Sequence, residues 1–101
     1  MNLLIDPAAE EETREAAAWY EQQRPGLGLE FLAAIDTAIQ RIRRAPAQFS
    51  RLETLPEEES VRRALTDRFP YAVIFEEGEE EIRVLAVAHT RRRPNYWRRR
   101  H

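Results

Sequence analysis

The chain has 101 residues, of which 43% are hydrophobic and 34% are charged, and its formal net charge is −2. This length suits a single domain over residues 1–101, and the absence of cysteine excludes a disulfide framework and cysteine-based zinc or thiol chemistry. No apolar run reaches the roughly 20 residues needed to cross a membrane, and the N-terminus lacks the features of a signal peptide, so we expect a cytoplasmic protein.

The first segment predicts a short strand followed by a helix. Residues 3–5 are an apolar run that is typical of a strand, and the Asp-Pro pair at residues 6–7 is typical of a helix start. The Pro-Gly pair at residues 25–26 ends this helix. Along one side of the helix, small residues are followed by aromatic ones, and we expect Trp19 and Tyr20 to lie in the core.

A second helix is expected from about residue 28, where no convincing N-terminal cap is found, to Pro46. Its apolar residues recur at three- and four-residue steps and form one stripe: Phe31, Leu32, Ile35, Ala38, Ile39 and Ile42. Because only a few residues separate the two helices, they should fold back as an antiparallel hairpin. Residues 46–60, with two prolines and three successive glutamates, indicate an exposed connection.

From residue 60 the sequence period changes to two, and residues 61–66 predict a half-buried strand. The runs 68–75 and 82–89 are rich in β-branched and aromatic residues and flank an acidic turn at Gly78, which predicts a β-hairpin. The last strand is apolar on both faces, as is typical of a central strand. We expect its faces to alternate, with Ile82, Val84, Ala86 and Ala88 opposite Arg83, Leu85, Val87 and His89. The fold class is therefore α+β: an N-terminal strand, an antiparallel helical hairpin, then a small, mostly antiparallel sheet, in the order β-α-α-β-β-β.

Charge is segregated along the chain. Residues 1–60 carry 6 arginines and 12 acidic residues, whereas residues 61–101 carry 10 arginines and 6 acidic residues. Seven arginines lie on the predicted strands or at their ends: Arg62, Arg63, Arg68, Arg83, Arg91, Arg92 and Arg93. Some of them should converge on one side of the sheet, where they could hold an anionic partner. The alternative is a solvated face whose arginines pair with the abundant glutamates.

His89 ends the last predicted strand beside these arginines. It could act as a general acid or base, because histidine titrates near neutrality, or it could simply fix the strand end by a hydrogen bond. Tyr96 and Trp97 lie between two arginine triplets, a mixture found in nucleic-acid binders but also in terminal helices that seal a sheet. We expect Trp97 to pack and leave Tyr96 open. The sequence has no Gly-rich phosphate loop, no Ser–His pattern and no metal-ligand spacing, so we expect no metal and no cofactor.

Several short motifs, taken in order, carry a resemblance to a known family. They are Trp19-Tyr20, Pro25-Gly26-Leu27-Gly28, Val61-Arg62-Arg63, Phe69-Pro70-Tyr71, and His89 with Arg92, Pro94, Tyr96 and Trp97. Over nearly the whole chain they resemble the RelE/ParE superfamily of bacterial toxins. The resemblance implies a RelE/ParE-like fold and the toxin of a type II toxin–antitoxin module. It also implies a cognate antitoxin that wraps a helix and an extended segment around the helical hairpin and the sheet.

The superfamily has two branches that act differently. RelE-like members enter the ribosomal A site and cut mRNA by attack of a ribose 2′-hydroxyl on the adjacent phosphate. Resemblance to this branch implies catalytic roles for Arg68, His89 and Tyr96, with the ribosome and mRNA as partners. The chain has no lysine and a net charge of −2, whereas mRNA-cutting relatives are strongly basic.

ParE-like members poison DNA gyrase by protein–protein contact, without chemistry of their own. Resemblance to this branch implies a structural His89 and a target-binding surface on the C-terminal strand and tail. The arginines available for that surface are Arg62, Arg63, Arg83, Arg91, Arg92 and Arg93. The match is closest to the ParE side at Trp19-Tyr20 and Phe69-Pro70-Tyr71. Gyrase poisoning is thus the first hypothesis, ribosome-dependent mRNA cleavage the second, and a non-toxic antitoxin-binding relative the third.

Overall fold

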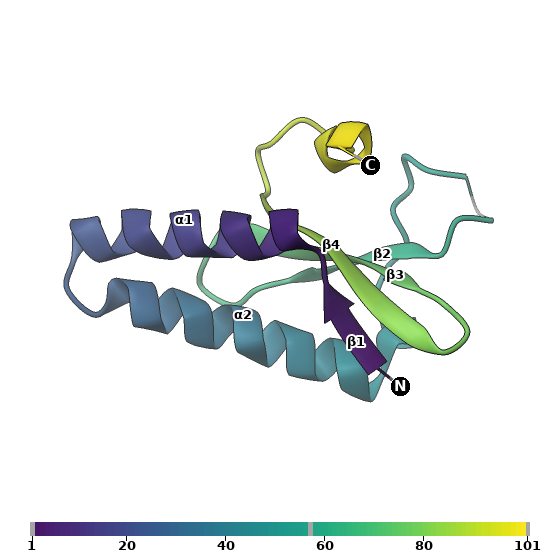
Figure 1. Ribbon diagram of the computed structural model, residues 1–101, viewed down its shortest axis with the longest axis horizontal. Coiled ribbons are helices and arrows are strands. Elements are labelled where there is room, and N and C mark those ends of the chain that lie inside the picture. Colours follow the sequence, from purple (N-terminus) through teal and green to yellow (C-terminus); the bar gives the residue numbers. More distant parts are fainter. Residues whose placement is uncertain (1, 57, 101) are drawn as a thin grey trace.

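A computed structural model describes residues 2–56 and 58–100. Its elements are β1 (Asn2–Ile5), α1 (Pro7–Gln23), α2 (Leu27–Arg44), the 3₁₀ helix η1 (Pro46–Gln48), β2 (Val61–Leu65), β3 (Tyr71–Glu77), β4 (Glu81–His89) and the 3₁₀ helix η2 (Tyr96–Arg100). The helices and strands follow the predicted order β-α-α-β-β-β, and the two helices form a hairpin (Figure 1). The α+β fold class is therefore confirmed.

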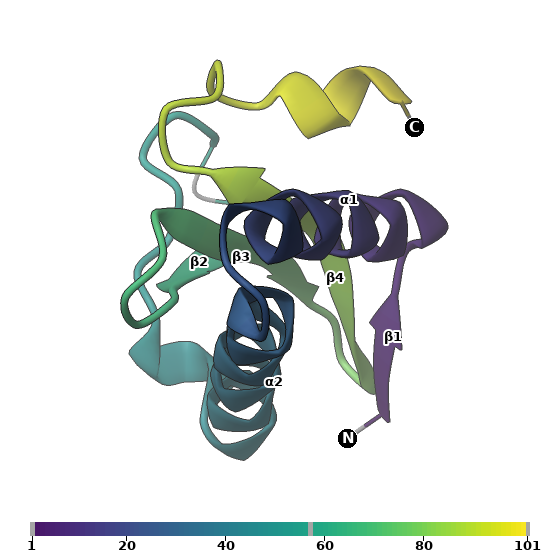
Figure 2. The same ribbon diagram turned by 90° about the vertical axis from the view of Figure 1, so that its left-hand side faces the viewer.

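The four strands form one sheet in the order β1-β4-β3-β2. β4 pairs antiparallel with β3 and parallel with β1, so it is a central strand, as its apolar faces predicted. Helices α1 and α2 lie against one face of the sheet, and the C-terminal tail crosses the other (Figure 2). We call these the helical face and the tail face. On β3, Tyr71, Val73 and Phe75 lie on the helical face, whereas Ala72 and Ile74 lie on the tail face.

The apolar stripe of α2 packs against the helical face as predicted, except for Leu32, which is exposed. Phe31, Ile35, Ala38 and Ile42 are buried, and Ile39 is partly buried against the same cluster. Burial of each large side chain contributes about 1.5–3 kcal/mol, so this stripe holds α2 firmly against the sheet. In the part of the chain that the structure describes, neither helix has the length and apolarity required to cross a membrane.

An aromatic cluster joins the hairpin to the β2–β3 loop and to β3. The ring centroid of Phe31 lies 5.2 Å from that of Tyr20, 5.3 Å from that of Phe69 and 5.0 Å from that of Tyr71. Trp19, by contrast, is 57% exposed, so the prediction that it belongs to the core is wrong. Successive residues of an α-helix point about 100° apart, and because Tyr20 faces the core, Trp19 is turned toward solvent.

The predicted alternation of β4 is interrupted by a β-bulge. Ile74 of β3 pairs with Ala86, but the next residue, Phe75, pairs with Val84, so Leu85 is an extra residue in β4. A bulge reverses the direction of every side chain beyond it. Val87 therefore joins Val84 in the cluster under the helices, whereas Ala86 belongs to the tail-face cluster. The predicted grouping of Ala86 with Val84 is corrected accordingly.

The N-terminus of α2 is capped by a side chain from the preceding helix. The Glu21 carboxylate accepts hydrogen bonds from the backbone N–H of Gly26 at 3.0 Å and of Gly28 at 3.0 Å. Gly26 has φ +90°, which favours glycine, and a Cβ on Gly28 would lie 2.7 Å from the carbonyl oxygen of Ala17. The Pro-Gly-Leu-Gly motif thus permits a sharp turn and a close helix approach.

We expect Glu21→Gln to reduce the loss of stability in acid. The two backbone hydrogen bonds, from Gly26 and then Gly28, lower the pKa of Glu21 below its usual value of 4.5. A lowered folded-state pKa stabilises the protein fully above about pH 4.5, and this contribution is lost as the pH falls through the lowered value. The free energy of unfolding, compared at about pH 7 and about pH 3, should change less in the variant than in the parent. Asp36→Asn, which removes an exposed carboxylate of α2 outside this turn, is the control, and an unaltered pH dependence in Glu21→Gln would contradict the assignment.

Candidate functional site

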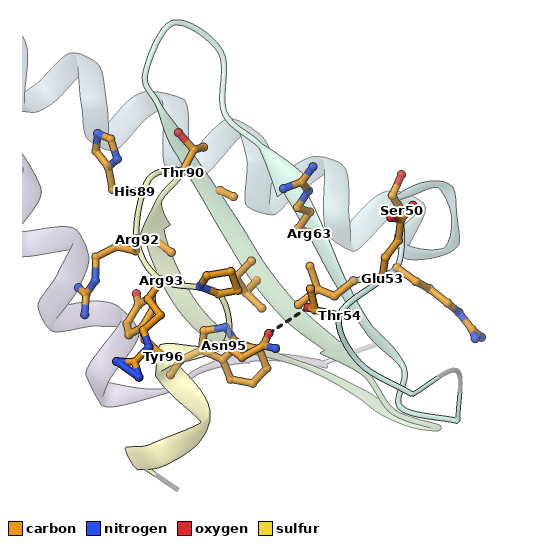
Figure 3. Close-up of a pocket in the computed structure, with 17 residues that line it drawn as sticks. Ser50, Glu53, Thr54, Arg63, His89, Thr90, Arg92, Arg93, Asn95 and Tyr96 are labelled. Carbon is orange, nitrogen blue, oxygen red and sulfur yellow. Dashed lines mark hydrogen bonds between the residues drawn. The ribbon is translucent and has the colours of Figure 1, made fainter.

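The tail face carries a cavity of about 380 Å³ (Figure 3). Its base lies on the central strands, where Ala72 of β3 pairs directly with Ala88 of β4 and Ile74 lies beside them. Two alanines opposite each other leave a depression, because their side chains rise little above the backbone. One wall is formed by residues 50–54 and the other by residues 92–97.

Trp97 fixes the second wall to the sheet. It is only 6% exposed and belongs to an apolar cluster with Val61, Ile74, Leu85 and Ala86, which confirms that it packs. This apolar contact holds the tail against the sheet.

Polar contacts on either side of Trp97 add to this attachment. Arg98 donates to both carboxylate oxygens of Glu59, at 2.8 and 3.1 Å. The hydroxyl of Thr54 lies 3.4 Å from Oδ1 of Asn95 and bridges the two walls. The tail is thus a fixed wall of the cavity.

Tyr96, one of the three predicted catalytic residues, is tied to α1. Its hydroxyl donates a short hydrogen bond to Oε2 of Glu12, and Oε1 of the same carboxylate accepts from the backbone N–H of Val87 at 3.0 Å. The guanidinium of Arg92 lies over the Tyr96 ring, 3.7 Å from its centroid. The Tyr96 hydroxyl is therefore part of a hydrogen-bonded link that joins α1, β4 and the tail.

His89, the second predicted catalytic residue, is held at the end of β4. Its ring packs edge-on against Tyr71, with centroids 5.2 Å apart, and Nδ1 accepts from the backbone N–H of Arg91 at 3.1 Å. In the β3–β4 ladder His89 pairs with Tyr71, and the Tyr71 side chain lies on the helical face. These contacts are those of the structural alternative, in which the histidine fixes the strand end.

Arg68, the third predicted catalytic residue, belongs to a different region. It lies in the β2–β3 loop with φ +70°, and its Nη2 is 2.6 Å from Oε1 of Glu30 on α2. Hydrogen bonds from Arg68 and then Arg24 lower the pKa of Glu30. Whereas His89 and Tyr96 contribute to the lining of the cavity, Arg68 does not. The structure therefore does not bring the three residues together as one reacting group.

The six arginines predicted to bind the target do not all lie in one place. Arg63, Arg92 and Arg93 line the cavity. Arg62 lies on the opposite face, where its Nη1 donates to the carbonyl of Phe49 at 2.6 Å. The remaining two are placed elsewhere.

Arg83 and Arg91 lie outside the cavity lining. Nη1 of Arg83 is 2.8 Å from Oδ1 of Asp6, so Asp6 pairs with this arginine instead of capping α1 with its side chain. Arg91 is exposed in the loop after β4. Half of the predicted set is thus gathered around one cavity.

A family model, described as the ParE toxin of the type II toxin–antitoxin system parDE, matches residues 3–94. The chain belongs to the ParE toxin family. This result agrees with the resemblance to the ParE side of the RelE/ParE superfamily.

A solved structure, titled chromosomal ParDE TA system from P. aeruginosa, is similar to this ParE-family chain. The TM-score is 0.76 at 20% sequence identity, and the match covers 88% of this chain and 95% of that one. At that identity the similarity concerns the fold. No curated protein sequence gives a significant match.

Some contacts of this ParE-family chain carried no clear sequence signal. Nothing in the sequence around Glu12 indicated that it would bind both Tyr96 and β4. Thr54 and Asn95 lie 41 positions apart and meet only because the tail folds back over the sheet. Among the described residues, no group of three or more acidic, histidine or cysteine side chains is placed to hold a metal ion.

Tyr96→Phe tests whether this tyrosine is structural. The variant keeps the ring under Arg92 but removes the donor to Glu12, so the free energy of unfolding should fall by about 1–2 kcal/mol. Urea unfolding measures the change, and Tyr20→Phe, whose hydroxyl has no hydrogen bond to a described residue, is the matched control. Growth inhibition by the induced toxin should persist. Its complete loss in a stably folded Tyr96→Phe variant would contradict the structural assignment.

Proposed function

We propose that this toxin inhibits growth by poisoning DNA gyrase through contacts made by its tail face, and that a cognate antitoxin neutralises it. The observation that carries the proposal is the gathering of Arg63, Arg92 and Arg93 around a cavity on that face. A surface that binds a protein target needs exposed cations and a shaped recess, but it needs no reacting group.

The placement of the predicted catalytic residues also supports contact over catalysis. A general acid or base must lie within about 2.6–3.2 Å of the proton that it transfers, directly or through one water. Here Arg68 pairs with Glu30, and the Tyr96 hydroxyl binds Glu12. His89 packs on Tyr71. RelE-like mRNA cleavage would require these contacts to be exchanged for contacts with RNA, so it is the alternative that the experiment must separate.

A surface for the antitoxin is available on the helical hairpin. Leu29 is 73% exposed and Leu32 is 39% exposed, one helical turn apart on α2. Exposed leucines at this spacing suit the apolar face of a partner helix. This agrees with the wrapped antitoxin that the family resemblance implies, and it leaves the tail face as a separate surface for the target.

The decisive experiment is induction of the chain without its antitoxin in a bacterial host. DNA breaks and the SOS response are followed together with mRNA cleavage on translating ribosomes. We expect DNA damage with intact mRNA, and co-expression of the antitoxin from the adjoining reading frame should restore growth. His89→Ala should remain toxic, because a contact poison needs no proton transfer from this ring.

Two other outcomes would contradict the proposed gyrase poisoning. Codon-phased mRNA cuts without DNA damage, abolished by His89→Ala, would make the protein an endoribonuclease. Normal growth on induction, with antitoxin binding retained, would make it a non-toxic relative.

A further inference from the structure

The cavity on the tail face concentrates cations that the protein itself does not neutralise. Four arginines line it, Arg51, Arg63, Arg92 and Arg93, and the last three form no ion pair with a described residue. Six arginines elsewhere each pair with a carboxylate: Arg14, Arg24, Arg62, Arg68, Arg83 and Arg98. The chain has 18 acidic residues against 16 arginines, so acids are not scarce. Within the described lining, Glu53 is the one acidic residue. Like charges gathered in this way favour an anionic partner.

The base of the cavity is apolar between these charges. Ala72, Ile74 and Ala88 form this base, and the hydroxyl-bearing Ser50 and Thr54 lie on one wall. At about 380 Å³ the cavity has the size of an ordinary ligand pocket and holds more than a single small anion. The chemistry of the lining therefore suits an apolar group with negative charge on either side of it.

The aromatic residues argue against a nucleotide. Single-stranded nucleic acids bind by stacking bases on exposed aromatic faces. Here Arg92 covers a face of the Tyr96 ring at 3.7 Å, and Trp97 is 6% exposed. The net charge of −2 would also repel a long polyanion. A short acidic peptide needs neither a stacking platform nor a basic protein.

We propose that the cavity receives an acidic peptide segment of the target protein, with an apolar side chain on the Ala72–Ala88 base and carboxylates bound by Arg63 on one side and Arg93 on the other. Figure 3 shows Arg63 on the sheet side of the cavity and Arg93 on the tail side, so carboxylates on both sides of one apolar residue can meet both arginines. The assignment of this segment to the target rests on the proposed function, whereas the chemistry of the site does not.

A labelled peptide, Glu-Asp-Leu-Asp-Glu, tests the site by fluorescence anisotropy with the purified full-length toxin. We expect Arg63→Glu and Arg93→Glu each to weaken binding roughly tenfold. Arg43→Glu, which reverses an exposed charge at the end of α2, should leave it unchanged. A Lys-Lys-Leu-Lys-Lys peptide should bind the Arg63→Glu variant better than it binds the parent. Because Arg63 and Arg93 are exposed, both variants should fold, and circular dichroism checks this.

The proposal is overturned if Ser-Ser-Leu-Ser-Ser binds as well as the acidic peptide, or if a ten-nucleotide single strand of deoxythymidine binds more tightly than it. The same variants are then compared for binding to purified gyrase. Gyrase binding that is unaffected by Arg63→Glu and Arg93→Glu would overturn the inference while the proposed function stands. Acidic-peptide binding without any gyrase binding by the parent would support the site and remove gyrase as its target. Loss of antitoxin binding in both variants would place the antitoxin in the cavity and overturn the assignment to the target.

Discussion

Phe31→Ala is expected to lower the free energy of unfolding by about 3–5 kcal/mol, which is a large part of the total stability of a domain of this size. Phe31 is fully buried and is the ring that Tyr20, Phe69 and Tyr71 all contact, at centroid distances of 5.0 to 5.3 Å. Removing it leaves a cavity where α1, α2, β3 and the β2–β3 loop meet. Tyr20 also contacts Phe69 and Tyr71, at centroid distances of 4.9 and 6.2 Å, and these rings keep the elements apart, so the cavity should not collapse without strain.

Urea unfolding measures this effect, with Leu29→Ala as the control on the same helix. Leu29 is 73% exposed, so its truncation should change the free energy of unfolding by less than about 0.5 kcal/mol. Equal losses in the two variants would contradict the packing of α2 on the sheet. Phe31→Leu, which keeps most of the apolar volume, should fall between the two.

The helical hairpin could be predicted from sequence because its signals are local. The apolar stripe of α2 recurs at helical spacing, and Pro-Gly marks the turn. Trp19 was misplaced because an aromatic residue next to Tyr20 carries the same composition signal, and only the direction of the helix against the sheet decides which ring is buried. The Leu85 bulge gave no signal either, because β4 is apolar on both faces and any register satisfies its pattern.

The sequence predicted that some of the arginines would converge on one side of the sheet, but not which of them or around what cavity. Alternation along β2 already sends Arg62 and Arg63 to opposite faces, yet the sequence does not say which face the helices cover. The cavity itself depends on contacts between distant segments. Ala72 meets Ala88 across the sheet, and residues 92–97 return to face residues 50–54. Such long-range contacts have no periodicity to reveal them.

Arg63→Ala is expected to abolish most of the toxicity while leaving antitoxin binding nearly unchanged. Arg63 is exposed beside the cavity and pairs with no described carboxylate, so its removal should spare the fold but weaken target binding roughly tenfold. Counts of viable cells after induction measure toxicity, and co-purification with the antitoxin measures binding. If both were lost together, the damage would lie in the fold instead.

The neighbouring substitution, Arg62→Ala, is expected to affect stability instead of target binding. Arg62 lies on the helical face, where it donates to the carbonyl of Phe49 and lies 3.4 Å from Oε1 of Glu77. Its removal should lower stability by about 1–3 kcal/mol, since it leaves a partly buried carbonyl without its donor and the Glu77 carboxylate without its ion pair. Residual toxicity should then follow the amount of folded protein. If Arg62→Ala abolished toxicity at unchanged stability, and Arg63→Ala did not, the helical face would be the target-binding surface and the tail face would be excluded.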